Sequence, residues 1–119
     1  WTDEEKSKRN IILEESLKHA CRVPLNIMEK SLEAINLHEE LETKGTNLAI
    51  SDVGVGVLFC KTALMGASMN VYINTKLMQD REYADDINLQ VSKILQQGIP
   101  KADKIYTSVM SQLTWIGDL

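Results

Sequence analysis

Residues 51–76, SDVGVGVLFCKTALMGASMNVYINTK, decide the fold of this chain of 119 residues. Between Asp52 and Lys76 they carry one charged side chain, Lys61, so we expect the segment to be buried. Ser51 is a suitable N-cap, and Asp52 would lie at the positive end of the helix dipole. The Val-rich first half of the segment, taken alone, would also fit a strand. The start signals favour a helix instead. We therefore predict a buried central helix over this stretch.

The apolar length of this segment would also fit a membrane span. However, Lys61, Asn70 and Asn74 are costly in lipid, and no basic cluster flanks the segment to set an orientation. We therefore expect no membrane partner and place the segment inside a helical domain.

Composition and charge set the class of protein. Hydrophobic residues make up 44% of the chain and charged residues 25%, as in an ordinary globular protein, so we predict a single domain over residues 1–119. The net charge of -4 lacks the basic footprint of a nucleic-acid-binding protein. Cys21 and Cys60 are too few for a disulfide framework, which favours reduced thiols and a cytoplasmic location.

Helical patterns also precede the central segment. The first runs over residues 3–22 and opens with Thr2 and Glu5 in the form of a capping box. The second runs over residues 24–44, because Pro24 is favoured at a first helical position. It should stop at Gly45, a residue that commonly ends helices, and residues 46–50 should form a short connection.

Another helical pattern follows the central segment and opens at Gln79 or Asp80. Gly98 and Pro100 interrupt its apolar spacing, so we expect a kink or a break near Gln97. The predicted fold class is therefore all-α, a bundle of four to five mostly antiparallel helices joined by short connections. The central helix carries more apolar surface than the other helices can cover, which predicts a homodimer.

Three polar residues of the central helix are candidates for chemistry. Asp52 is a candidate catalytic carboxylate, although it could merely complement the helix dipole. Asn70 and Asn74 are four residues apart and share a helix face, so they could grip a polar ring of a ligand or bond to neighbouring helices. His19 and His38 lack metal-ligand spacing with the two cysteines, so we expect no metal site.

Three strings of residues resemble a known family. VPL at residues 23–25 opens a helix, NLAISDVGV follows at residues 47–55, and GASMNVYIN follows at residues 66–74. Their order and separation are similar to those of the cyclodeaminase and cyclohydrolase family of folate metabolism. Tyr72 departs from the family pattern, in which Arg is frequent there. The family's glycine-rich opening segment does not occur, so we expect the domain to be incomplete at its N-terminus.

The resemblance implies a helical homodimer with a folate site in a cleft. The implied activity is that of a formiminotetrahydrofolate cyclodeaminase, which closes a ring to 5,10-methenyltetrahydrofolate and releases ammonia. The alternatives are a methenyltetrahydrofolate cyclohydrolase and a non-catalytic dimerising or folate-binding module. Asp52 would transfer a proton and balance a developing cation, and Asn70 and Asn74 would hold the pterin or orient a water. A tetrahydrofolate derivative would be the substrate, with no metal or bound cofactor required.

Overall fold

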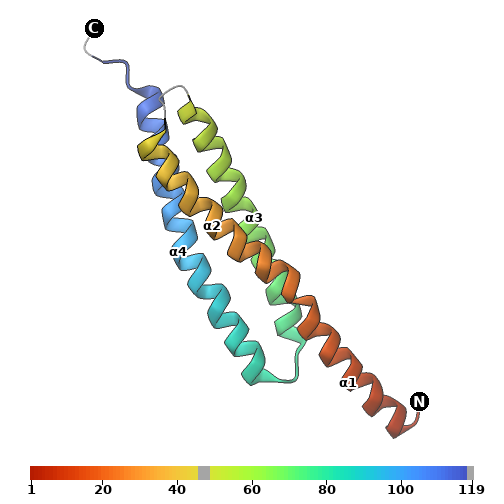
Figure 1. The fold of residues 1–119 in the computed structure, drawn as a ribbon. Helices are drawn as coiled ribbons and strands as arrows, with labels where there is room; N and C mark the ends of the chain where they lie inside the picture. The colour runs from red at the N-terminus through yellow and green to blue at the C-terminus, as the bar shows by residue number, and fades with distance from the viewer. Residues whose placement is uncertain (46–48, 118–119) are drawn as a thin grey trace.

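A computed structural model describes residues 1–45 and 49–117, and this part of the chain contains four helices and no strand. The helices are α1 (Asp3–Ala20), α2 (Arg22–Lys44), α3 (Ile50–Leu77) and α4 (Arg81–Thr114). The predicted all-α class is confirmed. Because α1 and α2 run nearly in line, the four helices form three rods, with α3 and α4 packed beside α2 (Figure 1).

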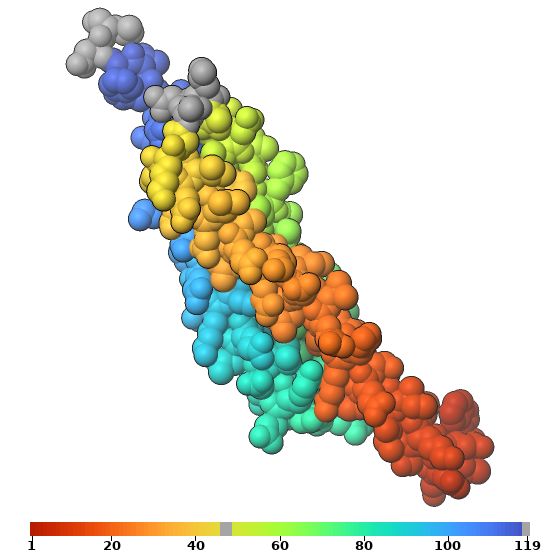
Figure 2. All heavy atoms as spheres, viewed as in Figure 1, coloured from red at the N-terminus to blue at the C-terminus, as the bar shows by residue number. Residues whose placement is uncertain are grey.

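The molecule is elongated, with principal extents of 80 × 19 × 19 Å. The body consists of α2, α3 and α4, each of which contacts the other two. The first half of α1 leaves this body as a narrow arm (Figure 2). Leu17 is the buried residue of α1, so the arm is held only near its C-terminal end.

The first helix begins as its sequence predicts. The side chain of Thr2 accepts a hydrogen bond from the Glu5 backbone, and the Glu5 carboxylate accepts one from the Thr2 backbone. The boundary between the first two helices lies earlier than predicted, at Cys21, so that Pro24 is the third residue of α2 and not its first. Helix α2 ends at Lys44 with Gly45 as its C-cap, as expected.

The start of α3 differs from its prediction. Ser51 is not the N-cap, because α3 begins at Ile50 and Ala49 occupies the cap position without a side-chain hydrogen bond. The predicted connection over residues 46–50 therefore ends earlier, and residues 46–48 lie outside the described residues. Asp52 remains in the first turn of α3, as predicted.

The break expected in the last helix near Gln97 is wrong, because α4 is one helix through this point. Asp80 caps α4 by accepting a hydrogen bond from the Tyr83 backbone, and the helix then continues through Pro100 to Thr114. Gly98 is buried against Leu64 of α3, where the absence of a side chain lets the two helices come close. Packing on both sides of Pro100 outweighs the one backbone donor that proline removes.

The core has two parts, one at each half of the bundle. Ile94 and Leu95 of α4 pack against both parts and join them. Helix α3 runs through both. The first part consists of Leu17, Cys21, Met28, Ala67, Val71, Met78, Ala84, Ile87 and Val91. The second consists of Ile35, Ile50, Val53, Val57, Leu64, Ala102, Ile105 and Val109.

Helix α3 is buried on one side and bare on the other. Val57, Leu64 and Val71 are fully buried between α2 and α4, whereas Phe59 is 73% exposed and Ile73 63% exposed. The expected excess of apolar surface on this helix is therefore present, and in the single chain nothing in the described residues covers it.

By length and composition alone, α3 would also be able to cross a membrane. However, α2 and α4 pack along α3, and their outer surfaces carry exposed charged residues such as Glu33 and Lys93. Lys61 of α3 forms an ion pair with Asp103 of α4, with 2.5 Å between Nζ and Oδ1. These contacts are typical of a helical bundle in water.

Candidate functional site

Asp52 is exposed in the first turn of α3. The backbone N–H groups at a helix N-terminus favour a negative charge at this position. The turn is held in place from behind by Gly54, where an added Cβ would lie 2.8 Å from Cγ1 of Val109 in α4. A carboxylate on a rigid helix end and open to solvent can accept a proton from a bound ligand or water.

The two candidate amides lie near the other end of α3. Asn70 is exposed and Asn74 is half-buried, so the expectation that both would be buried is wrong. The Asn74 side chain donates a hydrogen bond of 2.8 Å to the backbone oxygen of Asn70. Asn74 is thus anchored within its own helix and does not bond to a neighbouring one, and the Asn70 amide is open to a ligand.

The three predicted residues do not converge within one chain. Asp52 and Asn70 are 18 residues apart, which is five full helical turns, so both lie on the same side of α3. The same spacing puts their backbones about 27 Å apart, and those of Asp52 and Asn74 about 33 Å apart. The chain therefore carries Asp52 and the two amides at opposite ends of a single exposed surface.

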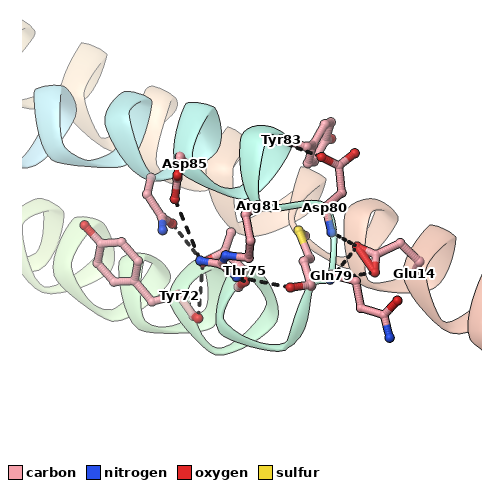
Figure 3. Close-up of polar contacts among 10 residues, drawn as sticks. Glu14, Tyr72, Thr75, Gln79, Asp80, Arg81, Tyr83 and Asp85 are labelled. Carbon is pink, nitrogen blue, oxygen red and sulfur yellow. Dashed lines mark hydrogen bonds and ion pairs between the residues drawn. The ribbon is translucent and has the colours of Figure 1, made fainter.

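A second group of polar residues lies at the turn between α3 and α4 (Figure 3). The Glu14 carboxylate of α1 accepts hydrogen bonds from the backbone N–H of Gln79, at 2.8 and 3.1 Å, and from that of Asp80, at 3.3 Å. Lys18 of α1 donates a 2.7 Å hydrogen bond to Asp80, and its ammonium lies 4.6 Å from the centre of the Tyr83 ring. We call these five residues the turn cluster.

Arg81 and Thr75 extend the hydrogen bonding beneath the turn. The Arg81 guanidinium donates to the backbone oxygens of Thr75, at 2.7 Å, and Met78, at 3.1 Å, and so occupies acceptors at the C-terminal end of α3 (Figure 3). The Thr75 hydroxyl donates to the Asn88 side chain at 2.8 Å. These contacts hold the end of α3 that carries Asn74.

Two charged groups of the turn cluster have shifted pKa values. The hydrogen bond to Asp80 raises the pKa of Lys18 above 10.5. The hydrogen bonds from Lys18 and from the Tyr83 backbone lower the pKa of Asp80 below 3.8. Both shifts keep the groups charged near neutral pH, so the pair is a fixed ionic contact between α1 and α4 and a poor donor or acceptor of protons.

The described residues offer few other reactive groups. In residues 1–45 and 49–117 no group of three or more His, Cys, Asp and Glu side chains is placed to hold a metal ion. Burial raises the pKa of the Cys21 and Cys60 thiols, which disfavours the reactive thiolate. A hollow of about 500 Å³ lined by Ile50, Gln112 and Trp115 lies near the start of α3, but Asp52 does not line it.

Sequence reasoning did not identify the turn cluster. Glu14 and Lys18 are more than 60 residues from their partners Gln79 and Asp80, and no local motif joins them. The acidic residue at the α4 N-cap was the one local signal, and it indicated only a helix start.

The chain is similar to known proteins over most of its length. Residues 1–93 match the family model described as formiminotransferase-cyclodeaminase. The chain is 37% identical over 112 residues to a methenyltetrahydrofolate cyclohydrolase of Methylorubrum extorquens, a match that covers 94% of the chain and 54% of that protein. It is 31% identical over 108 residues to the formimidoyltransferase-cyclodeaminases of Rattus norvegicus and Mus musculus, covering 91% of the chain and 20% of each. The chain thus spans about half the cyclohydrolase and a fifth of the two longer enzymes.

Proposed function

Because the chain belongs to the formiminotransferase-cyclodeaminase family, we propose that it is an enzyme of folate one-carbon metabolism that acts on the methenyl ring of a tetrahydrofolate. Of the two reactions expected from the sequence, we place the cyclohydrolase first, which reverses their earlier order. The observation that carries this choice is the higher identity, 37% against 31%, to the relative named as a cyclohydrolase. The cyclodeaminase reaction is the second candidate.

In the cyclohydrolase reaction, water adds to the cationic methenyl carbon. One carbon–nitrogen bond of the ring then breaks, which leaves a formyl group on the other nitrogen and releases one proton. The step needs a base that removes a proton from the attacking water and a negative charge near the cation. Asp52, exposed at the N-terminal end of α3, has the chemistry for both roles.

Asn70 and Asn74 would bind the pterin or orient the water. An amide offers both donors and an acceptor, which matches the donor and acceptor edge of a pterin ring. Because Asn74 already donates to the Asn70 backbone, its side-chain oxygen is held in a fixed direction. The turn cluster would support this end of α3 without contacting the substrate.

The proposal also covers the assembly, the location and the cofactor requirement of the enzyme. The enzyme would work as a homodimer in the cytoplasm, with a folate as substrate and without a metal or bound cofactor. The bare apolar side of α3 supports the dimer, and the two reduced thiols support the compartment.

Replacing Asp52 with Asn tests the catalytic role. The change keeps the shape and the capping ability but removes the charge and the basicity, so turnover should fall by about 100-fold or more while stability changes little. Three measurements are made on each protein: the loss of absorbance of 5,10-methenyltetrahydrofolate, the release of ammonia from 5-formiminotetrahydrofolate, and a melting curve. Asp86→Asn, at an exposed carboxylate of α4, is the matched control and should keep full activity.

The outcomes separate the candidates. Methenyl loss without ammonia release supports the cyclohydrolase, and ammonia release supports the cyclodeaminase. An active Asp52→Asn protein with a lowered melting temperature would show that Asp52 serves only the helix dipole. Folate binding without turnover in the wild-type protein would leave a non-catalytic binding module.

A further inference from the structure

His38 of α2 is half-buried, and its ring lies against α3. Its Nδ1 atom is 2.6 Å from the backbone oxygen of Ala34, one turn earlier in the same helix. A carbonyl oxygen carries no proton, so Nδ1 is the donor of this hydrogen bond. The neutral ring therefore carries its proton on Nδ1, and Nε2 is left without one.

Nε2 faces a bare part of the α3 backbone. A Cβ added at Gly56 would collide with this nitrogen, so the tip of the ring occupies the space that a side chain would fill. Within residues 1–45 and 49–117, Nε2 has no hydrogen-bond partner. The neutral ring fits this contact. A protonated ring would press an N–H group against a Cα atom that offers no acceptor, and an N–H shielded from water without a partner is costly.

Asp52 lies within reach of a protonated His38 ring. It precedes Gly56 by one turn of α3, and side chains at this spacing have their Cβ atoms about 5–6 Å apart. Because Nε2 touches the Cβ position of Gly56, it lies within about 8 Å of the Asp52 Cβ atom. The carboxylate oxygens extend two bonds further, and the imidazole can turn about two side-chain bonds. The two groups can therefore meet without a change in the backbone.

The other ionisable groups around His38 are engaged elsewhere or uncharged. Glu42, one turn later in α2, accepts hydrogen bonds from side chains of α4. Burial raises the pKa of the Cys60 thiol of α3, which keeps it neutral. Lys101 of α4 donates to a side chain on another side of α2. Asp52 is thus the charged group beside the ring that has no partner among the described residues.

We propose that His38 is a pH-sensitive switch that controls access to Asp52. The neutral ring rests on Gly56 and leaves the carboxylate open, as in the structure. When Nε2 takes a proton from the solvent, the ring leaves Gly56 and donates a hydrogen bond to Asp52. The ring gives up its bond to Ala34 and gains one between opposite charges. If Asp52 serves the proposed reaction, acid lowers turnover through this contact. That consequence rests on the proposed function, whereas the movement of the ring does not.

Nuclear magnetic resonance of protein labelled at histidine measures the switch without an activity assay. At about pH 8 we expect the proton on Nδ1 of His38 and nuclear Overhauser contacts between its ring and the Cα protons of Gly56. Where the ring resonances show protonation, these contacts should vanish and contacts to the Cβ protons of Asp52 should replace them. His19, exposed on α1, is the control in the same sample and should gain no such contact.

Gly56→Ala should produce the displaced ring without acid. The added methyl group takes the place of the Nε2 tip, so contacts between His38 and Asp52 should be present already at about pH 8. Gly66→Ala is the matched control in the same helix. Nothing lies within 4 Å of the Cβ position at Gly66, so this change should leave the ring in place.

Several results would overturn the switch. A protonated ring that keeps its contacts with Gly56, or that leaves Gly56 without approaching Asp52, would contradict the proposed movement. A neutral ring with its proton on Nε2 would contradict the starting state. A ring that stays in place in Gly56→Ala would show that the contact does not hold it.

The pH dependence of turnover tests the consequence for the proposed reaction. Asn at position 38 can still donate to the Ala34 oxygen but cannot take a proton, so His38→Asn should keep its turnover in acid where the wild-type protein loses it. The wild-type loss should approach about tenfold per pH unit, as for any single protonation. His19→Asn should follow the wild-type profile. Equal profiles in the wild-type protein and His38→Asn would refute control of turnover by His38. A wild-type protein without turnover at any pH would instead refute the proposed function, and the ring contacts would still decide whether the switch exists.

Discussion

Gly98 should be intolerant of a side chain for as long as Leu64 remains opposite it. A Cβ at Gly98 would lie 3.1 Å from Cδ1 and 3.3 Å from Cδ2 of Leu64, and 3.5 Å from Cδ1 of Leu32. Leu64 is 0% exposed in the middle of the bundle, so it cannot move outward into solvent. The alanine gains about 1 kcal/mol from helix propensity and loses about 1–3 kcal/mol to overpacking. Gly98→Ala should therefore destabilise the protein by about 0–2 kcal/mol.

The sign of this effect should reverse when the opposing side chain is shortened. Leu64→Ala removes both Cδ atoms and should cost about 2–5 kcal/mol by itself. In that background the overpacking is gone, so Gly98→Ala should stabilise the protein by about 1 kcal/mol. The coupling between the two sites is then about 1–3 kcal/mol, within the range seen for residues in contact.

Urea denaturation followed by circular dichroism measures the stability of all four proteins of this cycle. All four are measured at one chain concentration, because self-association would also contribute to stability. A Gly98→Ala change that stabilises the wild-type protein as much as it stabilises Leu64→Ala would refute the reasoning. It would mean that α3 and α4 are not in close contact at this point and that Pro100 is accommodated for another reason.

Two further predictions concern the turn cluster. The pKa of Asp80 is lowered in the folded protein, so its ionised carboxylate stabilises the fold above the unfolded pKa near 3.8. This stabilisation is lost as the pH falls through the lower folded pKa. In urea melts, Asp80→Asn should therefore lose less stability than the wild-type protein between about pH 6 and about pH 3. An unchanged pH dependence would contradict this. Glu14→Ala should cost about 1 kcal/mol and speed amide exchange at Gln79 and Asp80, whereas Glu15→Ala, at the exposed neighbouring position, should do neither. Equal amide exchange at Gln79 and Asp80 in both variants would show that the Glu14 carboxylate does not protect these amides.

Much of the fold could be predicted from local signals. The capping box at Thr2, the stop at Gly45 and the cap at Asp80 each depend on residues within a few positions of one another. The break near Gln97 could not be judged in this way, because Pro100 is tolerated only through contacts with α3 that are distant in sequence. The N-cap of α3 was misplaced by two residues, at Ser51 in place of Ala49, because Ser is common at this position and Ala49 carries no capping signal.

The candidate site was predictable in its residues but not in its geometry. Asp52, Asn70 and Asn74 stood out because they are polar residues in an apolar helix. Their distances follow only from the helix being straight and continuous, which places Asp52 and the two amides at opposite ends of one surface. The exposure of Asn70 had no local signal, and the turn cluster had none beyond the helix start at Asp80, because both depend on how α1 and α4 meet α3.

Stability decreases along the rod formed by α2 and α1, from the bundle toward the first turns of α1. Before Leu17 the helix buries no residue, so its first turns have little beyond their own hydrogen bonds and the capping box to hold them. Isolated helices of this length are marginal in water. The first turns of α1 can therefore open and close while α2, α3 and α4 stay folded, and complete unfolding is needed only to open the amides around Met28, Val71 and Val91. Within the described residues, Lys18 and Glu14 mark the point at which α1 begins to contact the turn between α3 and α4.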